Sequence, residues 1–474
     1  MSLKIALPKG RLIARTAELL RKADWGLSTY YEGTRVYRPK SKKFPGLLAK
    51  VFHEKDIPIQ VAVGNYDLGI CGLDWIEELM IKYPSSSLVK LRNLEYGEGS
   101  LYVVNSKSRK KANLEELRAE TGLLRIASEY PNLSESFALN ARLRQFSIFP
   151  LWGAAEAYPP ESADLALISR REDEPVFDNN LSVVGKIIDF GAYLIANKNS
   201  WESKNLSQLL ASIEDVVAVM DNNLSQRDET GVRSVTGRQT FERIPEDTVR
   251  LALPDGHQQT PTTQLLEKAG IRMEDYPSET GNHRPGSNLE GVVIKVIRPQ
   301  DMPLQVANGN FDLAITGRDW LTDHFCQFPS SPVNEFLNLG FGGVKIVAVV
   351  DKELPVENAY DLKQLYAERT VSIRVASEYV NIADKYAIDN HFGKYRVIPT
   401  WGATEAFLPE DADLLIENTE TGRTIARNNL KIIDTLFAST ACLVGNKNSI
   451  SSVAKGERIK LIIETLKGAV EVLN

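Results

Sequence analysis

The residues best suited to chemistry form one run in the second half of the chain, residues 412–424. An apolar stretch leads into the carboxylate of Glu417 and then into a turn of small and hydroxyl-bearing residues, Thr421–Thr424. Backbone N–H groups and threonine hydroxyls in such a turn can donate to phosphate oxygens, and a carboxylate at a strand end can accept hydrogen bonds from ribose hydroxyls. The run fits a sugar phosphate, and it fits the N-cap of an ordinary helix equally well.

The equivalent run in the first half of the chain, residues 163–175, has lost this chemistry. Relative to the second half, the replacements are Ile168 for Glu417, Glu172 for Thr421, Asp173 for Gly422 and Pro175 for Thr424. Two carboxylates would repel a phosphate, and proline removes an N–H donor. We therefore expect no phosphate binding by this copy.

The opposite asymmetry appears near the start of each half. The first half carries the cationic turn Lys9-Gly10-Arg11, whereas the second half has Asp255-Gly256-His257 at the same place. Cations are disfavoured at a helix N-terminus, so a ligand-binding role explains Lys9 and Arg11 better than simple solvation does. The basic stretch 35–43 of the first half is either part of this cationic surface or a solvated loop.

These paired runs belong to a tandem repeat that covers nearly the whole chain. Five motifs recur in the same order at offsets of 245 to 249 residues, among them Arg125–Tyr130 with Arg374–Tyr379. A unit of this length is a complete domain pair rather than a solenoid repeat. We predict a first unit over 1–220, a polar linker over 221–247 and a second unit over 248–474.

Within each unit, short apolar strands alternate with amphipathic helices, which predicts an α/β fold with mostly parallel sheets. In the first unit, strands are expected near 4–7, 101–104 and 123–127, and a closing helix over 206–220. The pattern predicts two lobes per unit, one over 1–103 plus 190–220 and the other over 104–189. A groove between two α/β lobes is the expected ligand site.

Composition excludes several other classes of protein. The 474 residues carry a net charge of −6, which argues against a general affinity for nucleic acid or for membrane surfaces. No apolar run approaches the length of a membrane span, and the N-terminus does not resemble a signal peptide. Three scattered cysteines and five scattered histidines predict a reducing, cytoplasmic location and no metal site built by the protein.

Several of these motifs resemble those of ATP phosphoribosyltransferase, the first enzyme of histidine biosynthesis. The resemblance rests on IALPKGRL, DLGICGLDW, RIASEYPNL and ENTETGRTIARNNL, and it spans both units. It implies two fused copies of the short-form catalytic core, each with a fold like that of type II periplasmic binding proteins. It also implies a reaction in which N1 of ATP attacks C1 of phosphoribosyl pyrophosphate, with Mg²⁺ on the departing pyrophosphate.

The resemblance also assigns roles to residues at matching positions. In the second unit, a turn would hold the 5-phosphate and Glu417 would contact the ribose hydroxyls, although the family usually has Asp there. The turn consists of Glu420, Thr421, Gly422, Arg423 and Thr424. Lys9 and Arg11 match a basic turn that would contact ATP or pyrophosphate.

Further matching positions lie in the second unit. Arg298 matches a family arginine, where the first unit has His53. Asp312 and the pair Thr316-Gly317 match a strand-end turn that lines the groove between the lobes. Tyr379 would either pack on adenine or belong to the core.

Family enzymes are dimers in which basic residues of one subunit approach the site of the other. We therefore expect an internal pseudo-dimer with one productive site around the second unit's turn, completed by cations of the first unit. Thr421→Asp should abolish turnover, whereas changes at Glu172 should matter little. A regulatory subunit resembling histidyl-tRNA synthetase and a higher homo-oligomer stay open, as do two other functions: a non-catalytic regulatory paralogue and a small-ligand binding protein.

Overall fold

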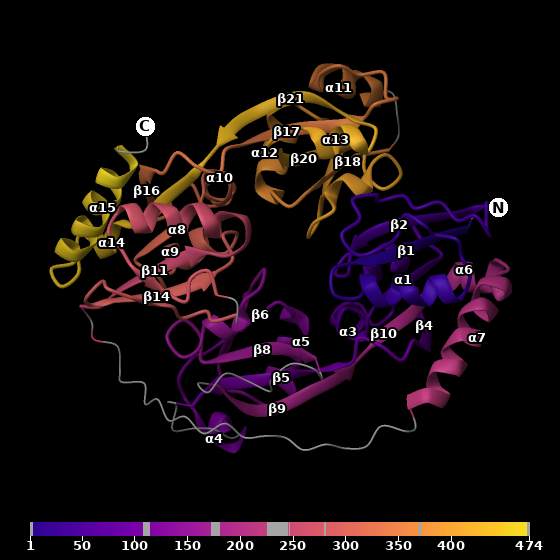
Figure 1. Ribbon diagram of the computed structural model, residues 1–474, viewed down its shortest axis with the longest axis horizontal. Helices are drawn as coiled ribbons and strands as arrows, with labels where there is room; N and C mark the ends of the chain where they lie inside the picture. The colour runs from indigo at the N-terminus through magenta and orange to yellow at the C-terminus, as the bar shows by residue number, and fades with distance from the viewer. Residues whose placement is uncertain are drawn as a thin grey trace.

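The computed structural model describes residues 3–107, 114–171, 181–224, 245, 247–278, 281–367 and 371–471. These residues form four α/β lobes, two from each unit, arranged around a common centre (Figure 1). None of the helices in the described part of the chain is long and apolar enough to cross a membrane. Most of the expected linker, and the first-unit residues 172–175, lie outside the described residues.

The first lobe of the first unit is built on a five-stranded sheet with the order β2-β1-β3-β10-β4. Its strands are β1 (Leu3–Lys9), β2 (Leu47–His53), β3 (Leu68–Gly72), β4 (Leu88–Asn93) and β10 (Ala192–Asn197). Its helices are α1 (Ile13–Lys22), α2 (Ile57–Ala62), α3 (Leu73–Lys82), α6 (Lys198–Ser203) and α7 (Ser207–Leu224). Only β10 runs against its neighbours, so four of the five strands point the same way.

The second lobe of the first unit has the sheet order β7-β6-β8-β5-β9. Its elements are β5 (Gly99–Ser106), α4 (Leu114–Ala119), β6 (Leu124–Ser128), α5 (Pro131–Asn140), β7 (Phe146–Pro150), η1 (Ala155–Ala157), β8 (Leu165–Arg171) and β9 (Leu181–Phe190). The chain enters this lobe at Gly99 and leaves it at Phe190, because β5 and β9 pair over their whole lengths. The chain therefore crosses into the second lobe five residues before the expected start at residue 104.

The second unit repeats both lobes with the same strand orders. Its first lobe contains β11 (Val249–Pro254), η2 (Gly256–Gln258), α8 (Gln259–Lys268), β12 (Met273–Glu274), β13 (Gly286–Ser287), β14 (Val292–Ile297), α9 (Met302–Ala307), β15 (Leu313–Gly317), α10 (Arg318–Gln327), β16 (Val333–Asn338), β22 (Ala441–Asn446), α14 (Lys447–Ile450) and α15 (Gly456–Glu471). Its second lobe contains β17 (Val344–Asp351), α11 (Ala359–Ala367), β18 (Ile373–Ser377), α12 (Val380–Asp389), β19 (Tyr395–Pro399), η3 (Thr404–Phe407), β20 (Leu414–Thr419), α13 (Arg423–Arg427) and β21 (Leu430–Ser439). This confirms the predicted fold class: an α/β chain with two tandem copies of a two-lobed core.

The two units contact each other through unlike lobes. In Figure 1, the first lobe of the first unit (indigo) lies beside the second lobe of the second unit (orange). The rings of Phe52 and Phe407 meet edge to face there, with their centroids 5.3 Å apart. At the equivalent contact on the other side, Ile297 shares a buried apolar cluster with Tyr158. The apolar cores therefore continue across both contacts, and each unit covers surface that the other would otherwise expose.

Ion pairs repeat the same crosswise pattern. Lys50 of β2 reaches Glu410 at 2.5 Å and Asp411 at 3.0 Å in the second unit. Lys295 of β14, its counterpart, reaches Glu161 of the first unit at 2.6 Å. Because each contact pairs the same elements in exchanged units, the chain has the arrangement of a two-fold dimer within one polypeptide.

Candidate active site

Two neighbouring strand ends of the first unit present polar side chains toward the second unit. Lys9 ends β1 and His53 ends β2, and the parallel register pairs these two residues directly. The Lys9 ammonium donates a hydrogen bond to the Tyr37 hydroxyl over 3.3 Å. Gly10 follows with φ +89°, a conformation that favours glycine and turns the chain immediately after Lys9.

The second unit contributes three glutamates from three elements. Glu378 follows β18, Glu405 lies on η3 and Glu417 lies on β20. Burial raises the pKa of Glu417 well above its ordinary value, and the nearby charges of Glu378 and Glu405 raise it further. Burial and Glu405 likewise raise the pKa of Glu378 to about 7.

These two sets of side chains meet, and we call them together the composite cluster: Lys9, Tyr37, His53, Glu378, Glu405 and Glu417. A Cβ atom added at Gly402 would lie 3.7 Å from the Glu378 carboxylate and 3.9 Å from the His53 ring. Burial and the charges of Glu405 and Glu417 raise the Tyr37 pKa, while the Lys9 charge opposes the rise at Glu378. Cationic, phenolic and carboxylate groups of both units therefore share one site.

His53 is electrostatically distinct within the composite cluster. Burial, reinforced by the positive charges of Lys55, Lys9, Arg11 and Arg298, lowers its pKa to about 3. The imidazole is therefore neutral at physiological pH and can donate one hydrogen bond and accept another.

The sequence-predicted phosphate turn follows β20 and leads into α13. Gly422 has φ +70° and donates its N–H to the Thr419 hydroxyl over 2.9 Å. The first hydrogen bond within α13 runs from the Ala426 N–H to the Gly422 carbonyl. The N–H groups before Ala426 therefore have no acceptor within the helix itself. Glu420, Thr421 and Arg423 are exposed. The turn thus presents its donors outward, next to Glu417 on the preceding strand.

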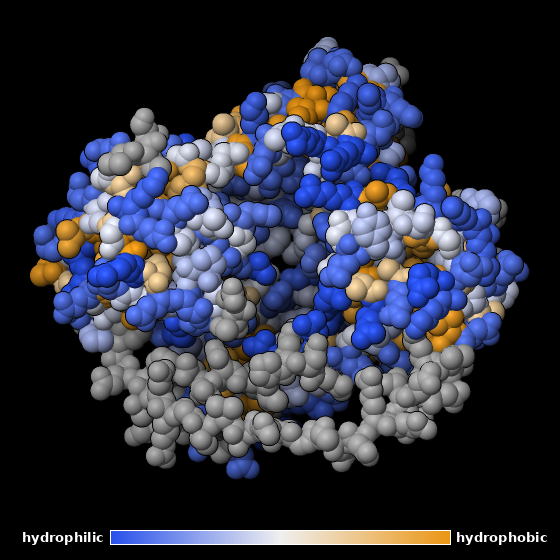
Figure 2. All heavy atoms as spheres, in the orientation of Figure 1, coloured by the Kyte–Doolittle hydropathy of each residue, from blue (hydrophilic) through white to orange (hydrophobic). Residues whose placement is uncertain are grey.

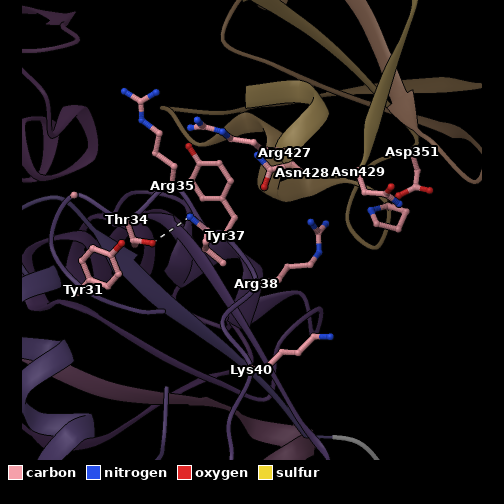
Figure 3. A pocket seen from close by; sticks show the side chains of 13 residues that line it. Tyr31, Thr34, Arg35, Tyr37, Arg38, Lys40, Asp351, Arg427, Asn428 and Asn429 are labelled. Atoms are coloured by element: carbon pink, nitrogen blue, oxygen red, sulfur yellow. Dashed lines mark hydrogen bonds between the residues drawn. The ribbon is translucent and has the colours of Figure 1, made fainter. Parts of the chain in front are cut away.

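A cavity of about 870 Å³ opens between the units beside this turn (Figure 3). Four cationic side chains line it, and among its described lining residues only Asp351 carries negative charge. The cations are Arg35, Arg38 and Lys40 of the first unit and Arg427 of the second. Tyr37 of the composite cluster also lines it, so the cavity adjoins the cluster. Figure 2, in the orientation of Figure 1, shows a hollow near the centre of the molecule, where hydrophilic side chains gather.

A second cavity, of about 420 Å³, lies at the place related to the composite cluster by exchange of the units, and we call it the mirror cavity. It is lined by Arg11, Glu129, Tyr130, Ala154, Ala155, Glu156, Leu167, Ile168, Ser169, Arg170, Arg171, Asp255, His283 and Arg298. His283 hydrogen-bonds Glu156 over 3.1 Å, and Arg298 pairs with Asp255 over 2.8 Å. Although burial opposes ionisation, the His283 hydrogen bond lowers the pKa of Glu156 to about 2.

Residues at the positions equivalent to the composite cluster line the mirror cavity, but most of them are of a different chemical type. The equivalences are Asp255 for Lys9, His283 for Tyr37, Arg298 for His53, Glu129 for Glu378, Glu156 for Glu405 and Ile168 for Glu417. His283 and Tyr37 match in the backbone as well, since each accepts a hydrogen bond from the neighbouring strand, from Val296 and Val51 respectively.

Four residues carry the sequence-predicted catalytic roles, and the structure divides them between the two sites. Lys9 and Glu417 belong to the composite cluster. Arg11 and Arg298 line the mirror cavity instead, where a Cβ atom at Gly153 would lie 2.7 Å from the Arg298 guanidinium. Arg11 is also held by Glu54 at 3.0 Å and Asp74 at 2.8 Å. The crosswise contacts explain the place of Arg298, because the first lobe of each unit faces the second lobe of the other. Arg11 instead reaches the mirror cavity from the first lobe of the same unit that supplies Glu129 and Tyr130.

The predicted groove-lining positions of β15 have structural partners. Asp312 precedes the strand, so it lies at the edge of the sheet opposite to the carboxyl ends. Its carboxylate accepts the Arg250 N–H over 2.8 Å and pairs with Lys455 over 3.1 Å. The Thr316 hydroxyl donates to the Pro299 carbonyl over 2.8 Å, and Gly317 forms the N-cap of α10.

Tyr379 occupies the core, one of the two roles that the sequence left open. It is 1% exposed, and its hydroxyl donates to Asp319 over 2.6 Å. Asn418 donates to the same hydroxyl over 2.9 Å, and the ring of Trp320 lies with its centroid 4.3 Å away. The phenol therefore links the first lobe of the second unit to the residue after Glu417.

Sequence reasoning missed four residues that the structure places in the composite cluster. They are Tyr37, His53, Glu378 and Glu405. The glutamates stand inside two repeated motifs, Ala-Ser-Glu-Tyr and Trp-Gly-Ala-Thr-Glu-Ala, and that repetition was the available signal. In the second unit, the Gln258 side-chain amide lies near Gly317, as the Arg11 guanidinium lies near Gly72 in the first unit. The buried side-chain carbonyl oxygen of Gln258 has no hydrogen-bond partner among the described residues.

Among the described residues, no group of three or more histidine, cysteine, aspartate or glutamate side chains could hold a metal ion. In the composite cluster, the Lys9 charge lies near enough to Glu378 to oppose the rise of its pKa. Within the described residues, the site therefore shows no coordination sphere supplied by the protein alone.

By fold and site, the chain is a tandem two-lobed α/β protein whose units share a charged inter-unit site. The sequence model of ATP phosphoribosyltransferase matches residues 53–215 and 298–468, and the chain belongs to that family. It is 30% identical to an ATP phosphoribosyltransferase of Prosthecochloris aestuarii over 222 residues, covering 47% of this chain and 71% of that protein. An ATP phosphoribosyltransferase of Sulfurisphaera tokodaii is 29% identical over 229 residues, 48% of this chain and 74% of that protein.

Solved structures are more distant. An ATP phosphoribosyl transferase (HisG:HisZ) complex from Thermotoga maritima matches with a TM-score of 0.39 and 23% identity, over 47% of this chain and 99% of that one. The periplasmic aliphatic sulphonate binding protein SsuA from Escherichia coli matches with a TM-score of 0.31 and 15% identity, over 48% of this chain and 71% of that one.

Proposed function

We propose that this chain transfers the phosphoribosyl group of phosphoribosyl pyrophosphate to N1 of ATP, at one site that both units build. In this reaction the bond between C1 and N1 forms and the bond between C1 and the pyrophosphate oxygen breaks. The products are phosphoribosyl-ATP and pyrophosphate, as in the first step of histidine biosynthesis.

One observation carries the proposal. Lys9, Tyr37 and His53 of the first unit meet three glutamates of the second unit beside the only phosphate turn whose sequence is intact. Neither unit alone holds a full set of cations, carboxylates and turn donors, whereas the crosswise contact assembles one. Family membership supports phosphoribosyl transfer as the reaction that this set serves.

The residues of the composite cluster have complementary tasks in the proposed reaction. The turn Thr421–Thr424 would hold the 5-phosphate through N–H and hydroxyl donors. Glu417 would accept hydrogen bonds from the ribose hydroxyls, and its negative charge would stabilise the positive charge that develops on the ribose ring. Lys9, which donates a hydrogen bond to Tyr37 and lies near the charge of Glu378, would donate to the departing pyrophosphate.

The cationic cavity beside the cluster fits the second substrate. Arg35, Arg38, Lys40 and Arg427 can neutralise the triphosphate of ATP while its adenine extends toward C1 of the ribose. Holding both substrates in one site converts their encounter into an intramolecular step, which supplies much of the acceleration in two-substrate reactions.

Mg²⁺ enters this proposal with the substrate. No metal site made by the described residues is available, so the ion would be bound mainly through phosphate oxygens and would arrive with phosphoribosyl pyrophosphate. When bound there, it neutralises charge on the leaving group.

Other parts of the proposal concern the chain's surroundings. Its two units form the internal pseudo-dimer, and we propose a regulatory subunit resembling histidyl-tRNA synthetase as its partner in a higher assembly. The three free cysteines, two of them buried, fit a reducing cytoplasm.

The test is formation of phosphoribosyl-ATP by the purified chain with ATP, phosphoribosyl pyrophosphate and Mg²⁺, followed by absorbance of the adduct. Thr421→Asp should abolish activity, and Glu405→Gln should lower kcat/KM by about 100-fold. The matched variant Glu156→Gln, which changes the equivalent residue of the mirror cavity, should leave activity near that of the wild type. Inactivity of the wild-type chain, alone and with the partner subunit, would favour a non-catalytic regulatory paralogue instead.

A further inference from the structure

A chain of three hydrogen bonds leads from the first lobe of the second unit to the Glu417 carboxylate. The Tyr379 hydroxyl donates to Asp319 of α10 over 2.6 Å, and the Asn418 side-chain amide donates to the same hydroxyl over 2.9 Å. The backbone N–H of Asn418 then donates to Glu417 Oε1 over 3.0 Å. The chain therefore ends on the carboxylate that we propose as the acceptor for ribose hydroxyls.

The chemistry of the groups sets the direction of each proton in this chain. A carboxylate accepts hydrogen bonds, so Tyr379 gives its single hydroxyl proton to Asp319. The phenolic oxygen then has only lone pairs left for Asn418, which must present its NH₂ group to it. Asp319 is 6% exposed and also accepts the Ser439 hydroxyl over 3.0 Å, so two hydroxyl groups compensate its burial. The phenol is thereby held from one side and holds the amide on the other.

The first unit keeps the start of this chain but has different residues at its end. Tyr130, the equivalent of Tyr379, donates its hydroxyl proton to Asp74 over 2.8 Å. The positions equivalent to Asn418 and Glu417 hold Ser169 and Ile168. The bond between phenol and carboxylate joins the two lobes in both units, whereas the continuation to a strand-end glutamate belongs to the second unit.

Other hydrogen bonds hold the lobes of each unit together without the phenol. In the second unit, Asp323 of α10 accepts the backbone N–H of Ile382 over 2.9 Å. In the first unit, Glu78 of α3 accepts that of Leu133 over 2.8 Å. Loss of either phenolic hydroxyl leaves these contacts between the lobes in place. Tyr379 and Tyr130 therefore form a matched pair that differs in what lies beyond the phenol.

We propose that Tyr379 is a positioning residue for sugar binding, which acts through Asn418 to orient the Glu417 carboxylate toward the ribose hydroxyls. This inference rests on the role given to Glu417 in the proposed function and adds the residues that fix its geometry. The bond from Asn418 to the phenol restrains rotation of residue 418. That restraint keeps one oxygen of Glu417 engaged by the backbone N–H and defines the direction of the other.

Calorimetric titration of the full chain with ribose 5-phosphate, and separately with inorganic phosphate, tests this proposal. The ratio of the two affinities measures recognition of the sugar, because both ligands carry the phosphate. Tyr379→Phe keeps the ring and removes the hydroxyl, so we expect ribose 5-phosphate to bind about tenfold more weakly while phosphate binding is unchanged. Tyr130→Phe is the matched control and should change neither affinity.

A second variant tests the route through Asn418. Asn418→Ser installs the first-unit residue and should weaken ribose 5-phosphate binding to a similar extent. Adding Tyr379→Phe to Asn418→Ser should cause little further loss, because both changes break the same hydrogen bond.

The outcomes separate this inference from the proposed reaction. An unchanged affinity ratio in Tyr379→Phe, or an equal loss in Tyr130→Phe, overturns the inference. Parallel weakening of both ligands assigns Tyr379 a structural role alone and also overturns it, as does a wild-type chain that binds ribose 5-phosphate no more tightly than phosphate. An inactive chain that shows the expected binding pattern would contradict the proposed reaction alone.

Discussion

Three glutamates lie close together in the composite cluster, an arrangement that costs free energy unless cations or protons compensate. Burial and mutual repulsion raise the pKa of Glu417 and Glu378, while Lys9 opposes the rise at Glu378. A positively charged sugar at the transition state would relieve the same repulsion. The negative charge of the cluster would therefore be stabilised more by a substrate that develops positive charge than by an empty site.

The raised pKa of Glu378 makes a pH prediction. Its pKa of about 7 lies above the ordinary 4.5 for glutamate, so the negative charge of Glu378 near Lys9 forms only as pH rises through about 7. We expect kcat/KM for phosphoribosyl-ATP formation to increase with pH across that range. Glu378→Gln should lower kcat/KM by about tenfold or more and remove this ascending limb. An ascending limb that persists in the variant would contradict the assignment.

At the scale of single residues, comparing the two repeats indicates which positions carry functional groups. It does not indicate which of those residues meet in space. Lys9 and Glu417 were identified because their equivalents, Asp255 and Ile168, have lost the relevant groups. Arg298 was placed with Glu417 by position within one unit. The structure puts His53 there instead, because lobe contacts cross between the units and no residue pattern within a unit encodes that crossing.

At the level of elements, β2 and β14 carry matching lysines that bind the opposite unit. Among the carboxylates of the described residues, Lys295 pairs with Glu161 alone, whereas Lys50 pairs with both Glu410 and Asp411. Although burial opposes ionisation, the hydrogen bond from Arg284 and the charge of Lys295 lower the Glu161 pKa to about 2. The two lysines thus occupy equivalent positions, but Lys50 has two carboxylate partners and Lys295 has one.

That inequality predicts different costs for the same substitution. Glu161→Gln leaves the Lys295 ammonium, 3% exposed, without a carboxylate, so unfolding free energy should fall by about 3 kcal/mol. Glu410→Gln leaves Asp411 beside Lys50, and Glu410 is 40% exposed, so the loss should be about 1 kcal/mol or less. Urea denaturation of both variants measures the difference. Equal losses would show that the second carboxylate does not compensate.

Much of the element pattern could be predicted, because strands with regular apolar runs and closing helices have strong local signals. The strand expected over 123–127 is β6 (Leu124–Ser128), and the helix expected over 206–220 is α7 (Ser207–Leu224). Strand β7 (Phe146–Pro150) was missed. It is an edge strand that is only partly buried, so its sequence lacks a clear alternation.

At the scale of the molecule, the crosswise contact brings different side chains of the two units into one site. In the proposed function, the first unit contributes Lys9 and most cations of the adjoining cavity, and the second unit contributes carboxylates and the turn expected to hold phosphate. The net charge of −6 conceals this separation, because the cationic cavity is confined to the boundary between units. Duplication within one chain thus allows the two equivalent inter-unit sites to carry different residues.

The most direct test of this account is a double-mutant cycle across the units, with Lys9→Ala in the first and Glu378→Gln in the second. If both act at one site, each should lower kcat/KM for phosphoribosyl-ATP formation by about tenfold or more. Together they should lower it by clearly less than the product of the separate effects. The matched cycle of Asp255→Ala with Glu129→Gln should leave kcat/KM unchanged. Independent, multiplicative effects of Lys9→Ala and Glu378→Gln, or a loss of activity in the matched cycle, would contradict a single composite active site.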